Sequence, residues 1–301
     1  MGVKREVPSP PPAAAKRPKP EALPAAAAAA AAAVKRATPQ RAKPAAVLAT
    51  ESPFPRLLRP TAQECDVAVR TLRSIHGDLV TPEPAQPGIS GETDGLSVLD
   101  QLVATILSQN TTDALSWPAF LRLKAAFPAW DDVRTAEVED IAAPIRSAGL
   151  SAVKSARIKA ILEQLHATRG ECSLEHLREM GDAEAKALLC GFKGVGPKTV
   201  ACVLMFALRR HEFPVDAHVW KLARSLGWVP DAASREATYA HLNARVPGEL
   251  KHELHVLLVE HGKIAKNDPA ILRAALRQAG AIKPEDEVAM MAEPAVPKQE
   301  A

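Results

Sequence analysis

The stretch LLCGFKGVGPKTVACVLMF, residues 188–206, says more about this fold than any other part of the chain. Apolar runs flank the turn Gly194-Val195-Gly196, a pattern that predicts two helices joined by a tight hairpin. Glycine accepts φ angles that a side chain would resist, and N–H groups at the start of a helix can bind an anion. The stretch therefore predicts a helical hairpin that grips a phosphate.

A lysine and a carboxylate accompany this hairpin. Lys198 stands two places after the second glycine, and Asp216 follows eighteen residues later within FPVDAHVW, residues 213–220. An amine can act as a nucleophile and a carboxylate can assist it, so the pair suits chemistry on a nucleotide sugar. Asp216 also precedes a predicted helix, and an N-cap role is compatible with the chemical one.

The segment GFKGVGPKT, residues 191–199, comes close to the phosphate loop of nucleotide hydrolases, G-x-x-x-x-G-K-T. Pro197 occupies the position that this loop requires for lysine, and no strand is predicted before it, which argues against an ATP site. Two interpretations stay open. The hairpin either only grips DNA phosphates, with Lys198 as one more contact, or also carries catalysis.

Apolar residues recur at helical spacing through the rest of the chain, which predicts an all-α fold. Thr61 and Glu64 are typical of a capping box that starts a helix over 61–77, and residues 81–95 are predicted to form a loop. Pro118 is expected in a first turn, so that its helix begins near Ser116. Further helices are predicted over 175–180, 183–190, 199–208, 219–226, 236–246 and 250–260.

Charge is concentrated at the two ends of the chain. Residues 1–55 are predicted to be a disordered basic tail rich in alanine and proline, and residues 281–301 a disordered acidic tail. The middle is nearly neutral, so the overall charge argues only weakly for nucleic-acid binding. Lys16-Arg17-Pro18-Lys19 favours a nuclear location, with an ordinary solvated tail as the alternative. No apolar run is long enough to predict a membrane span.

Together these motifs resemble the endonuclease III-like branch of the helix-hairpin-helix DNA glycosylases, in which GVGxKT is followed by VDxHV. ILSQNTTD, residues 106–113, resembles the family's DNA-facing turn, and IRSAGLSAVKSA, residues 145–156, resembles its intercalation loop. The resemblance covers about 61–263 and is closest to the plant-type members. It implies a domain over 56–280 with two helical subdomains flanking a DNA-binding cleft. These subdomains are expected over about 96–212, and over 61–77 together with 213–280.

The resemblance also implies an activity, that of a bifunctional glycosylase and AP lyase. Lys198 would attack C1′ of the sugar and form a Schiff base, helped by a pKa lowered through desolvation and the helix start. Asp216 would stabilise the cationic sugar. Asn110 and Leu150 would fill the space left by a flipped base. Asn110 could equally be an N-cap, and Leu150 an apolar contact at a helix start.

Further contacts to DNA follow from the same resemblance. Gly194, Val195 and Gly196 would hold a backbone phosphate together with a monovalent cation, and Thr199 resembles the usual partner at the helix start. His218 would orient its loop or meet a phosphate, with a structural histidine as the alternative. The expected partner is double-stranded DNA with damaged or abasic sites, bound by a monomer.

One departure from the family concerns its cofactor. Many such enzymes follow their HG-K/R segment with four cysteines that hold a [4Fe–4S] cluster. Here His261-Gly262-Lys263-Ile264 is followed by Ala265-Lys266, and no cysteine comes after Cys202. We therefore expect no cluster and no metal site, and predict that 267–281 forms a plain helix beginning at Asp268-Pro269.

Two hypotheses from different classes result. The first is a glycosylase and lyase that acts on oxidised pyrimidines, and the second is a catalytically quiet helix-hairpin-helix DNA-binding protein. Retention of both Lys198 and Asp216 favours the first. A monofunctional mismatch glycosylase has less support, because such relatives usually lack the lysine.

Overall fold

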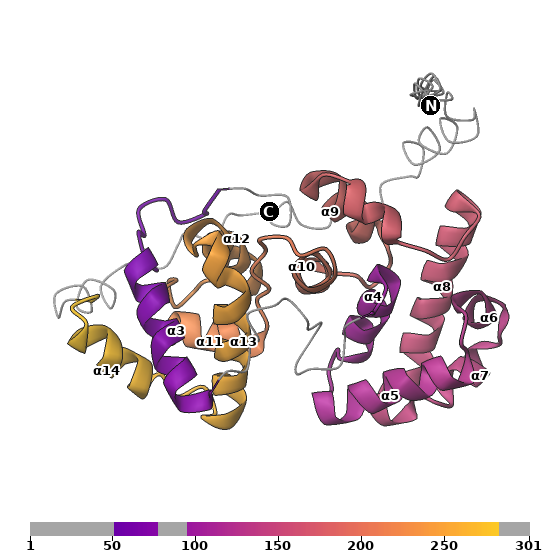
Figure 1. Cartoon of the computed structure of the whole chain (residues 1–301), viewed down its shortest axis with the longest axis horizontal. Coiled ribbons are helices and arrows are strands. Elements are labelled where there is room, and N and C mark those ends of the chain that lie inside the picture. Colours follow the sequence, from indigo (N-terminus) through magenta and orange to yellow (C-terminus); the bar gives the residue numbers. More distant parts are fainter. Residues whose placement is uncertain (1–50, 78–94, 283–301) are drawn as a thin grey trace, which may run out of the picture. The chain divides into compact units, whose positions relative to one another are not determined.

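The computed structural model describes residues 51–77 and 95–282, and every regular element within these ranges is helical (Figure 1). The prediction of an all-α fold is therefore confirmed. The predicted loop over 81–95 and most of the two predicted tails lie outside the described residues. Within the described ranges, no helix is long and apolar enough to cross a membrane.

A first core brings together the middle of the chain. Helix α4 (Val98–Leu107) is buried along nearly its whole length, and a capping box formed by Ser97 and Asp100 starts it. It contacts α5 (Asp113–Ala126) and α8 (Ser151–Arg169), and α8 also packs against the two short helices before it. The remaining elements are α6 (Trp130–Thr135), α7 (Val138–Ala142), a 3-10 turn (Arg146–Ala148), a second 3-10 turn (Glu175–Glu179) and α9 (Asp182–Gly191).

The prediction for Pro118 is wrong, because α5 begins at Asp113 and the proline lies inside the helix. Its ring removes only one backbone hydrogen bond, the one to residue 114. Burial of Phe120 and Leu123, and stacking of Trp117 on Phe120 at 5.3 Å between ring centroids, offset this loss.

A second core joins α3 (Ala62–His76) to helices from the far end of the chain (Figure 1). Helix α3 packs against α13 (Gly248–Ile264) and α14 (Ala270–Gln278), and α13 also contacts α11 (Ala217–Ser225). Helix α12 (Arg235–Arg245) contributes Tyr239 and Leu242 to the same core. Contacts between the beginning and the end of the described chain therefore close this core.

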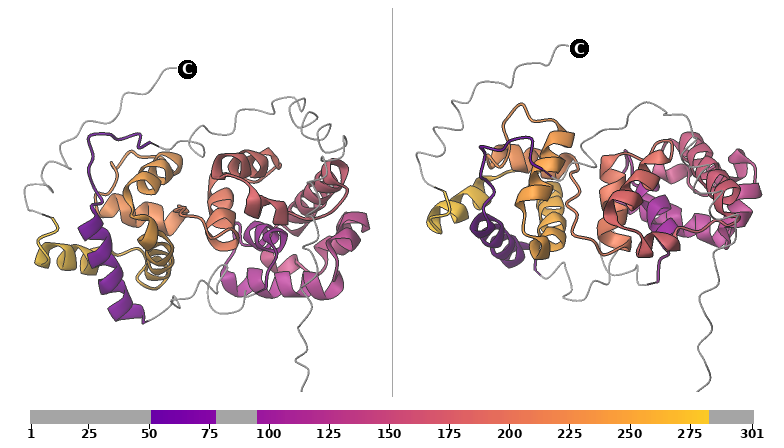
Figure 2. Two further views of the ribbon diagram at one scale, coloured as in Figure 1. Left: turned by 45° about the horizontal axis from the view of Figure 1, so that its top comes forward. Right: turned by 90° about the horizontal axis from the view of Figure 1, so that it is seen from above.

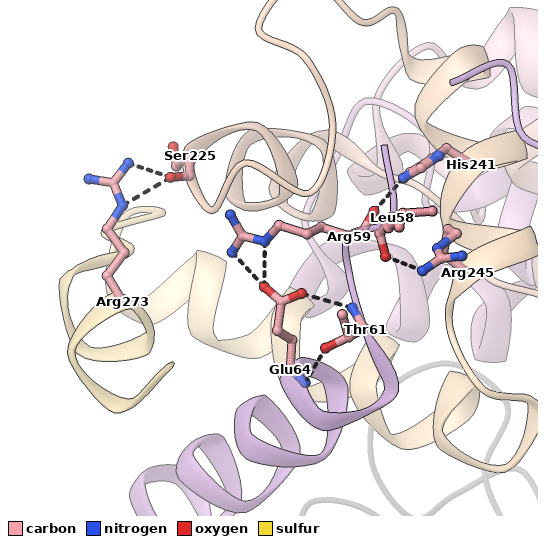
Figure 3. A network of polar contacts seen from close by, with 8 residues as sticks. All are labelled: Leu58, Arg59, Thr61, Glu64, Ser225, His241, Arg245 and Arg273. Atoms are coloured by element: carbon pink, nitrogen blue, oxygen red, sulfur yellow. Dashed lines mark hydrogen bonds and ion pairs between the residues drawn. The ribbon is translucent and has the colours of Figure 1, made fainter. Parts of the chain in front are cut away.

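Polar bonds anchor the start of α3 to this second core (Figure 3). The predicted capping box is confirmed, because Thr61 Oγ1 accepts from Glu64 N at 3.2 Å and Glu64 Oε2 accepts from Thr61 N at 2.8 Å. The same buried carboxylate pairs with Arg59, whose carbonyl accepts from His241 Nε2 at 2.6 Å. The ring of His241 also contacts the ring of Phe54.

A buried carboxylate links elements of both cores. Glu212, in the segment before α11, pairs with Lys186 of α9 and accepts from Tyr239 OH at 2.6 Å and Asn243 Nδ2 at 3.1 Å. Next to it, Lys251 Nζ donates to the Asn243 carbonyl at 2.7 Å. The network thus fixes the chain segment that leads from the first core to Asp216.

Residues of the hairpin segment, drawn in salmon in Figure 2, belong to both cores. Helix α10 (Pro197–Cys202) contributes Val200 to the first core and Ala201 to the second, and it contacts both α4 and α9. A π-helical turn (Val203–Ala207) continues it, where a single helix over 199–208 was predicted. Such π turns recur at functional sites.

Candidate active site

The hairpin is built from two buried anchors and one glycine with an unusual backbone. Phe192 and Val195 are buried, and the Val195 N–H donates to the Phe192 carbonyl at 3.2 Å. Gly194 has a φ of 84°, and a Cβ there would lie 2.0 Å from Arg157 Nε. Only glycine therefore fits at this position.

Gly196 differs from the expectation that both glycines need special φ angles. Its φ of −108° is ordinary extended backbone, and it serves as the N-cap of α10. A Cβ at Gly196 would meet no atom within 4 Å. Because Gly196 has no side chain, the space beside the start of α10 is open, and another molecule can approach the backbone there.

Lys198 is the second residue of α10 and is half-buried. Its pKa lies above the usual lysine range, raised most by a Cys202 thiolate; desolvation opposes this, and Asp216 and Asp113 raise the pKa further. The expected lowering of this pKa is therefore wrong, because the anionic neighbours outweigh desolvation. The amine is an ammonium at neutral pH.

Cys202 is a neighbour that the sequence analysis missed, although its i+4 spacing from Lys198 within one helix was visible. Its side chain is buried, and burial raises the pKa of the thiol, against the effect of Lys198. A thiol with a raised pKa is protonated at neutral pH. At that pH the carboxylates of Asp216 and Asp113 are therefore the charges that hold the ammonium.

Asp216 caps α11, as one interpretation of the sequence proposed. Its Oδ1 accepts from His218 N at 2.9 Å and from Val219 N at 2.8 Å. The same carboxylate acts electrostatically on Lys198, so the fold brings together two residues that are eighteen positions apart. Both residues stand in the first turn of a helix, one in α10 and one at the N-cap of α11.

His255, on α13, is a third titratable group at this place and was not identified from the sequence. It is 5% exposed, and its pKa is lowered to about 4 by burial, against the attraction of Asp216. Its Nδ1 has no hydrogen-bond partner among the described residues. At neutral pH the ring is therefore uncharged and adds no repulsion to Lys198.

Asn110 and Leu150 share a backbone feature, since both lie in the left-handed region with φ of 55° and 52°. The N-cap alternative for Asn110 is wrong, because Thr112 is the N-cap of α5. Leu150 is the N-cap of α8, as its alternative proposed, but the residue is 59% exposed, which argues against an apolar contact. Both side chains are exposed at turns that the surrounding structure holds in strained conformations.

Lys154, which the sequence analysis did not single out, connects these two turns. Its buried amine donates to the Leu107 carbonyl at 2.7 Å and to the Ala148 carbonyl at 2.8 Å. The first carbonyl lies just before the turn with Asn110, and the second just before Leu150. Burial lowers the pKa of this lysine, with Arg157 adding to the effect.

A polar chain continues from α8 to the hairpin. Arg157 Nη1 donates to Gln109 Oε1 at 2.5 Å, and Gln109 Nε2 donates to Thr199 Oγ1 at 3.1 Å. Thr199 is buried and its hydroxyl accepts from Gln109, while its contact with DNA stays a prediction. The same Arg157 lies against Gly194, so one side chain bridges both motifs.

Contacts from the end of α13 and from the turn after it reach Asp113 and His218. Lys263 Nζ pairs with Asp113 Oδ2 at 2.8 Å, and His218 Nδ1 donates to Asn267 Oδ1 at 2.8 Å. The predicted helix is α14, which begins at Ala270 with Pro269 as its N-cap. Among the described residues, no group of three His, Cys, Asp or Glu side chains could hold a metal ion.

A cavity of about 450 Å³ lies apart from these residues. Ser97, Glu175, Arg178 and Arg209 are among its lining residues, and none of the predicted site residues is. The site is therefore better defined by the arrangement of Lys198 and Asp216 than by this cavity.

Comparison with known proteins places the motifs in context. The model of the HhH-GPD superfamily, described as base excision DNA repair proteins, matches residues 103–248. "Putative DNA glycosylase At3g47830" of Arabidopsis thaliana is 47% identical over 236 residues, which are 72% of this chain and 80% of that protein. "DNA glycosylase/AP lyase ROS1" of Arabidopsis thaliana is 32% identical over 152 residues, 45% of this chain and 11% of that protein.

Among solved structures, an endonuclease III in a non-covalent complex with DNA superposes with a TM-score of 0.52 at 22% identity. The match covers 68% of this chain and 86% of that one. At this identity the match speaks for the fold alone.

Proposed function

Because the chain belongs to the HhH-GPD superfamily of base excision DNA repair proteins and is a DNA glycosylase of that family, we propose that it also acts as an AP lyase through Lys198. Its proposed substrate is a damaged base in double-stranded DNA, in particular an oxidised pyrimidine. The observation that carries the proposal is the placement of Lys198 and Asp216 together beside the hairpin.

The first chemical step exchanges one bond at the sugar for another. The nitrogen lone pair of Lys198 forms a bond to C1′, and the glycosidic C1′–N bond breaks. The base leaves with the electron pair of the broken glycosidic bond and takes up a proton. Asp216 stabilises the positive charge that develops on the sugar and helps to move the protons.

The second stage cleaves the strand. Loss of the amine proton and opening of the sugar ring produce a Schiff base between Lys198 and C1′. Removal of a C2′ proton then breaks the C3′–O bond by β-elimination, which nicks the strand 3′ to the lesion. Water hydrolyses the Schiff base and returns the free amine.

Attack requires the neutral amine, although the free protein holds an ammonium. The proton must therefore leave before the first step. Asp216 is a nearby carboxylate that can accept it, whereas Asp113 is paired with Lys263. His255 is uncharged at neutral pH, so it adds no positive charge that would oppose the developing oxocarbenium ion.

The turns around the site supply the proposed DNA contacts. The hairpin of Gly194, Val195 and Gly196 binds a backbone phosphate with a monovalent cation, and His218 faces the same strand. Val195 N–H is already bonded to the Phe192 carbonyl. Val195 therefore supports the phosphate-binding turn through its buried side chain. A monomer suffices for these contacts.

Asn110 and Leu150 have the exposure that insertion into a DNA stack requires. Flipping a base costs a few kcal/mol of stacking, and inserted side chains recover part of that cost. We propose that these two residues enter the space that the flipped nucleotide leaves.

The reaction proposed here uses no iron–sulfur cluster. All four cysteines, Cys65, Cys172, Cys190 and Cys202, are free thiols that precede α11, so none stands in the segment after α13. In that segment Lys266 and Asn267 form a turn into α14. The segment after α13 therefore lacks the cysteine thiolates that an iron–sulfur cluster needs as ligands.

The basic cluster Lys16-Arg17-Pro18-Lys19 supports a nuclear location for this activity. It lies outside the described residues, so the proposal rests on the sequence alone.

Borohydride trapping on duplex DNA tests the proposed function. DNA carrying an abasic site or thymine glycol should give a covalent adduct with the full chain, because borohydride reduces the Schiff base to a stable amine. Lys198→Ala should abolish the adduct. Lys193→Ala is the matched control, because it removes an exposed lysine of the same hairpin, and it should leave the adduct in place.

An adduct that persists in Lys198→Ala would show that another amine reacts. Duplex binding without any adduct, on either lesion, would instead favour the second hypothesis, a DNA-binding protein without lyase activity.

A further inference from the structure

The chain makes a tight turn between α13 and α14 that depends on two residues with unusual backbone angles. Lys266 has a φ of 51° and Asn267 a φ of 65°, both in the left-handed region. Asparagine adopts this region far more readily than most residues with a side chain. The Asn267 N–H donates to the Gly262 carbonyl at 3.1 Å, which closes the turn back onto the end of α13.

This turn aims the Asn267 side chain at His218. Asn267 Oδ1 lies 2.8 Å from His218 Nδ1. An amide oxygen only accepts hydrogen bonds, so His218 Nδ1 carries the proton. The bond joins residues that are 49 positions apart, one in the first turn of α11 and the other in the turn between α13 and α14.

Gly262 brings the two segments close enough for this bond. A Cβ at Gly262 would lie 2.6 Å from His218 Cβ and 2.9 Å from Asn267 Oδ1. No side chain fits there without displacing one of the two. The imidazole of His218 is thus held between the backbone of α13 and the carboxamide of Asn267.

The consequence reaches Asp216 through the backbone. His218 is the second residue of α11, and its N–H donates to Asp216 Oδ1 at 2.9 Å. Because Asn267 holds the imidazole ring of His218, it also fixes the orientation of the first turn of α11. When this first turn of α11 keeps its position, the N–H groups of His218 and Val219 hold the Asp216 carboxylate in one direction.

We propose that Asn267 is a positioning residue, which acts through His218 to hold the Asp216 carboxylate in its orientation beside Lys198. The inference rests on the proposed function, because it gives Asp216 a role in the reaction. Asn267 itself touches neither substrate nor the reacting atoms in this proposal.

Three variants separate the side chain of Asn267 from its backbone. Asn267→Gly preserves access to the left-handed conformation and removes the carboxamide. Asn267→Asp keeps an oxygen that accepts from His218 Nδ1. Lys266→Gly is the control, because it alters the neighbouring turn residue and leaves the carboxamide in place.

Single-turnover trapping under saturating enzyme measures the effect on the reaction. Misplacement of a catalytic group by about 1 Å costs up to roughly 100-fold in rate, so we expect Asn267→Gly to lose about 10- to 100-fold. Asn267→Asp should recover most of the rate, and Lys266→Gly should leave it unchanged. DNA affinity should change little in all three variants.

A double-mutant cycle tests the route through His218. If Asn267 acts only through that ring, His218→Ala and Asn267→Gly combined should be no slower than His218→Ala alone. Losses that multiply in the double variant would overturn the proposal, as would an Asn267→Gly variant that reacts at the full rate.

Hydrogen exchange provides a readout that does not depend on activity. The amides of His218 and Val219 bond to Asp216 and should exchange faster in Asn267→Gly, while amides in the middle of α4 keep their protection. Unchanged exchange at both amides would contradict the proposal even if the wild-type protein formed no adduct. A wild type without any adduct, but with the expected exchange, would refute the lyase activity and leave the positioning intact.

Discussion

Lys198 shows at the scale of single residues how neighbours set chemistry. Its pKa is raised by the Cys202 thiolate first and by two carboxylates as well, against desolvation. Because the folded pKa exceeds that of an unfolded lysine, the charge stabilises the fold below the unfolded pKa. That stabilisation is lost as pH rises through the folded pKa, while the fraction of reactive amine increases.

A substitution at Cys202 tests this balance. Cys202→Ser removes a group that can become an anion, so the pKa of Lys198 should fall towards the usual lysine value near 10.4. The single-turnover trapping rate rises with pH in both proteins, and in the variant the rise should occur at lower pH. A pH profile that moves to higher pH would contradict this account of Lys198.

At the scale of secondary elements, the first two turns of α8 organise the exposed turns. Lys154 joins the end of α4 to the end of the 3-10 turn, and Arg157 extends the connection through Gln109 to the hairpin. A helix that carries both residues on one side therefore relates the turns of Asn110 and Leu150 to each other. Their spacing is a property of α8, not of either turn alone.

Lys154→Met tests this role of α8. Methionine keeps the apolar stem and leaves two buried carbonyls without a donor, each at about 1–3 kcal/mol. We expect a loss of about 2–5 kcal/mol in the free energy of unfolding, measured with urea. Binding to duplex DNA that carries an abasic site should weaken as well, while Lys159→Met, on the same helix, should affect binding less.

Stability unchanged in Lys154→Met would mean that water replaces the amine at both carbonyls. Normal binding by a destabilised variant would show that the two turns keep their spacing without this lysine.

At the scale of the whole molecule, the two cores meet along the segment from α9 to α11. Val200 and Ala201, adjacent in α10, belong to different cores, and the Glu212 network joins α9 to α12. Lys198, in α10, and Asp216, the N-cap of α11, both lie within this segment. Their relative position thus depends on packing in both cores at once.

Glu212→Ala should therefore destabilise the molecule strongly. Removing one partner of a buried ion pair costs about 3–5 kcal/mol, because Lys186 is then left buried without its counter-charge. Urea unfolding measures the loss. The double variant Lys186→Met/Glu212→Gln removes both charges of the ion pair and keeps acceptors for Tyr239 and Asn243, so it should lose less. An equal loss would contradict the ion-pair explanation.

Local patterns predicted those features that depend on neighbours in the chain. Helical periodicity, the Thr61–Glu64 capping box and the N-cap at Asp216 follow from contacts within about four residues, and the structure confirms them. The same local rules failed for Pro118, because tertiary packing of α5 outweighs one lost hydrogen bond. They also gave Gly196 a backbone strain that belongs to Gly194 alone.

By itself, the sequence determined the all-α fold, the hairpin and the residue types of a lysine–carboxylate pair. Only the tertiary structure decided the environment of that pair, with Cys202 and His255 beside Lys198, Lys154 beneath the exposed turns, and Asn267 against His218. Helix formation follows from residues within a turn or two of one another. A pKa or the orientation of a carboxylate instead depends on groups that the packing of distant helices brings together.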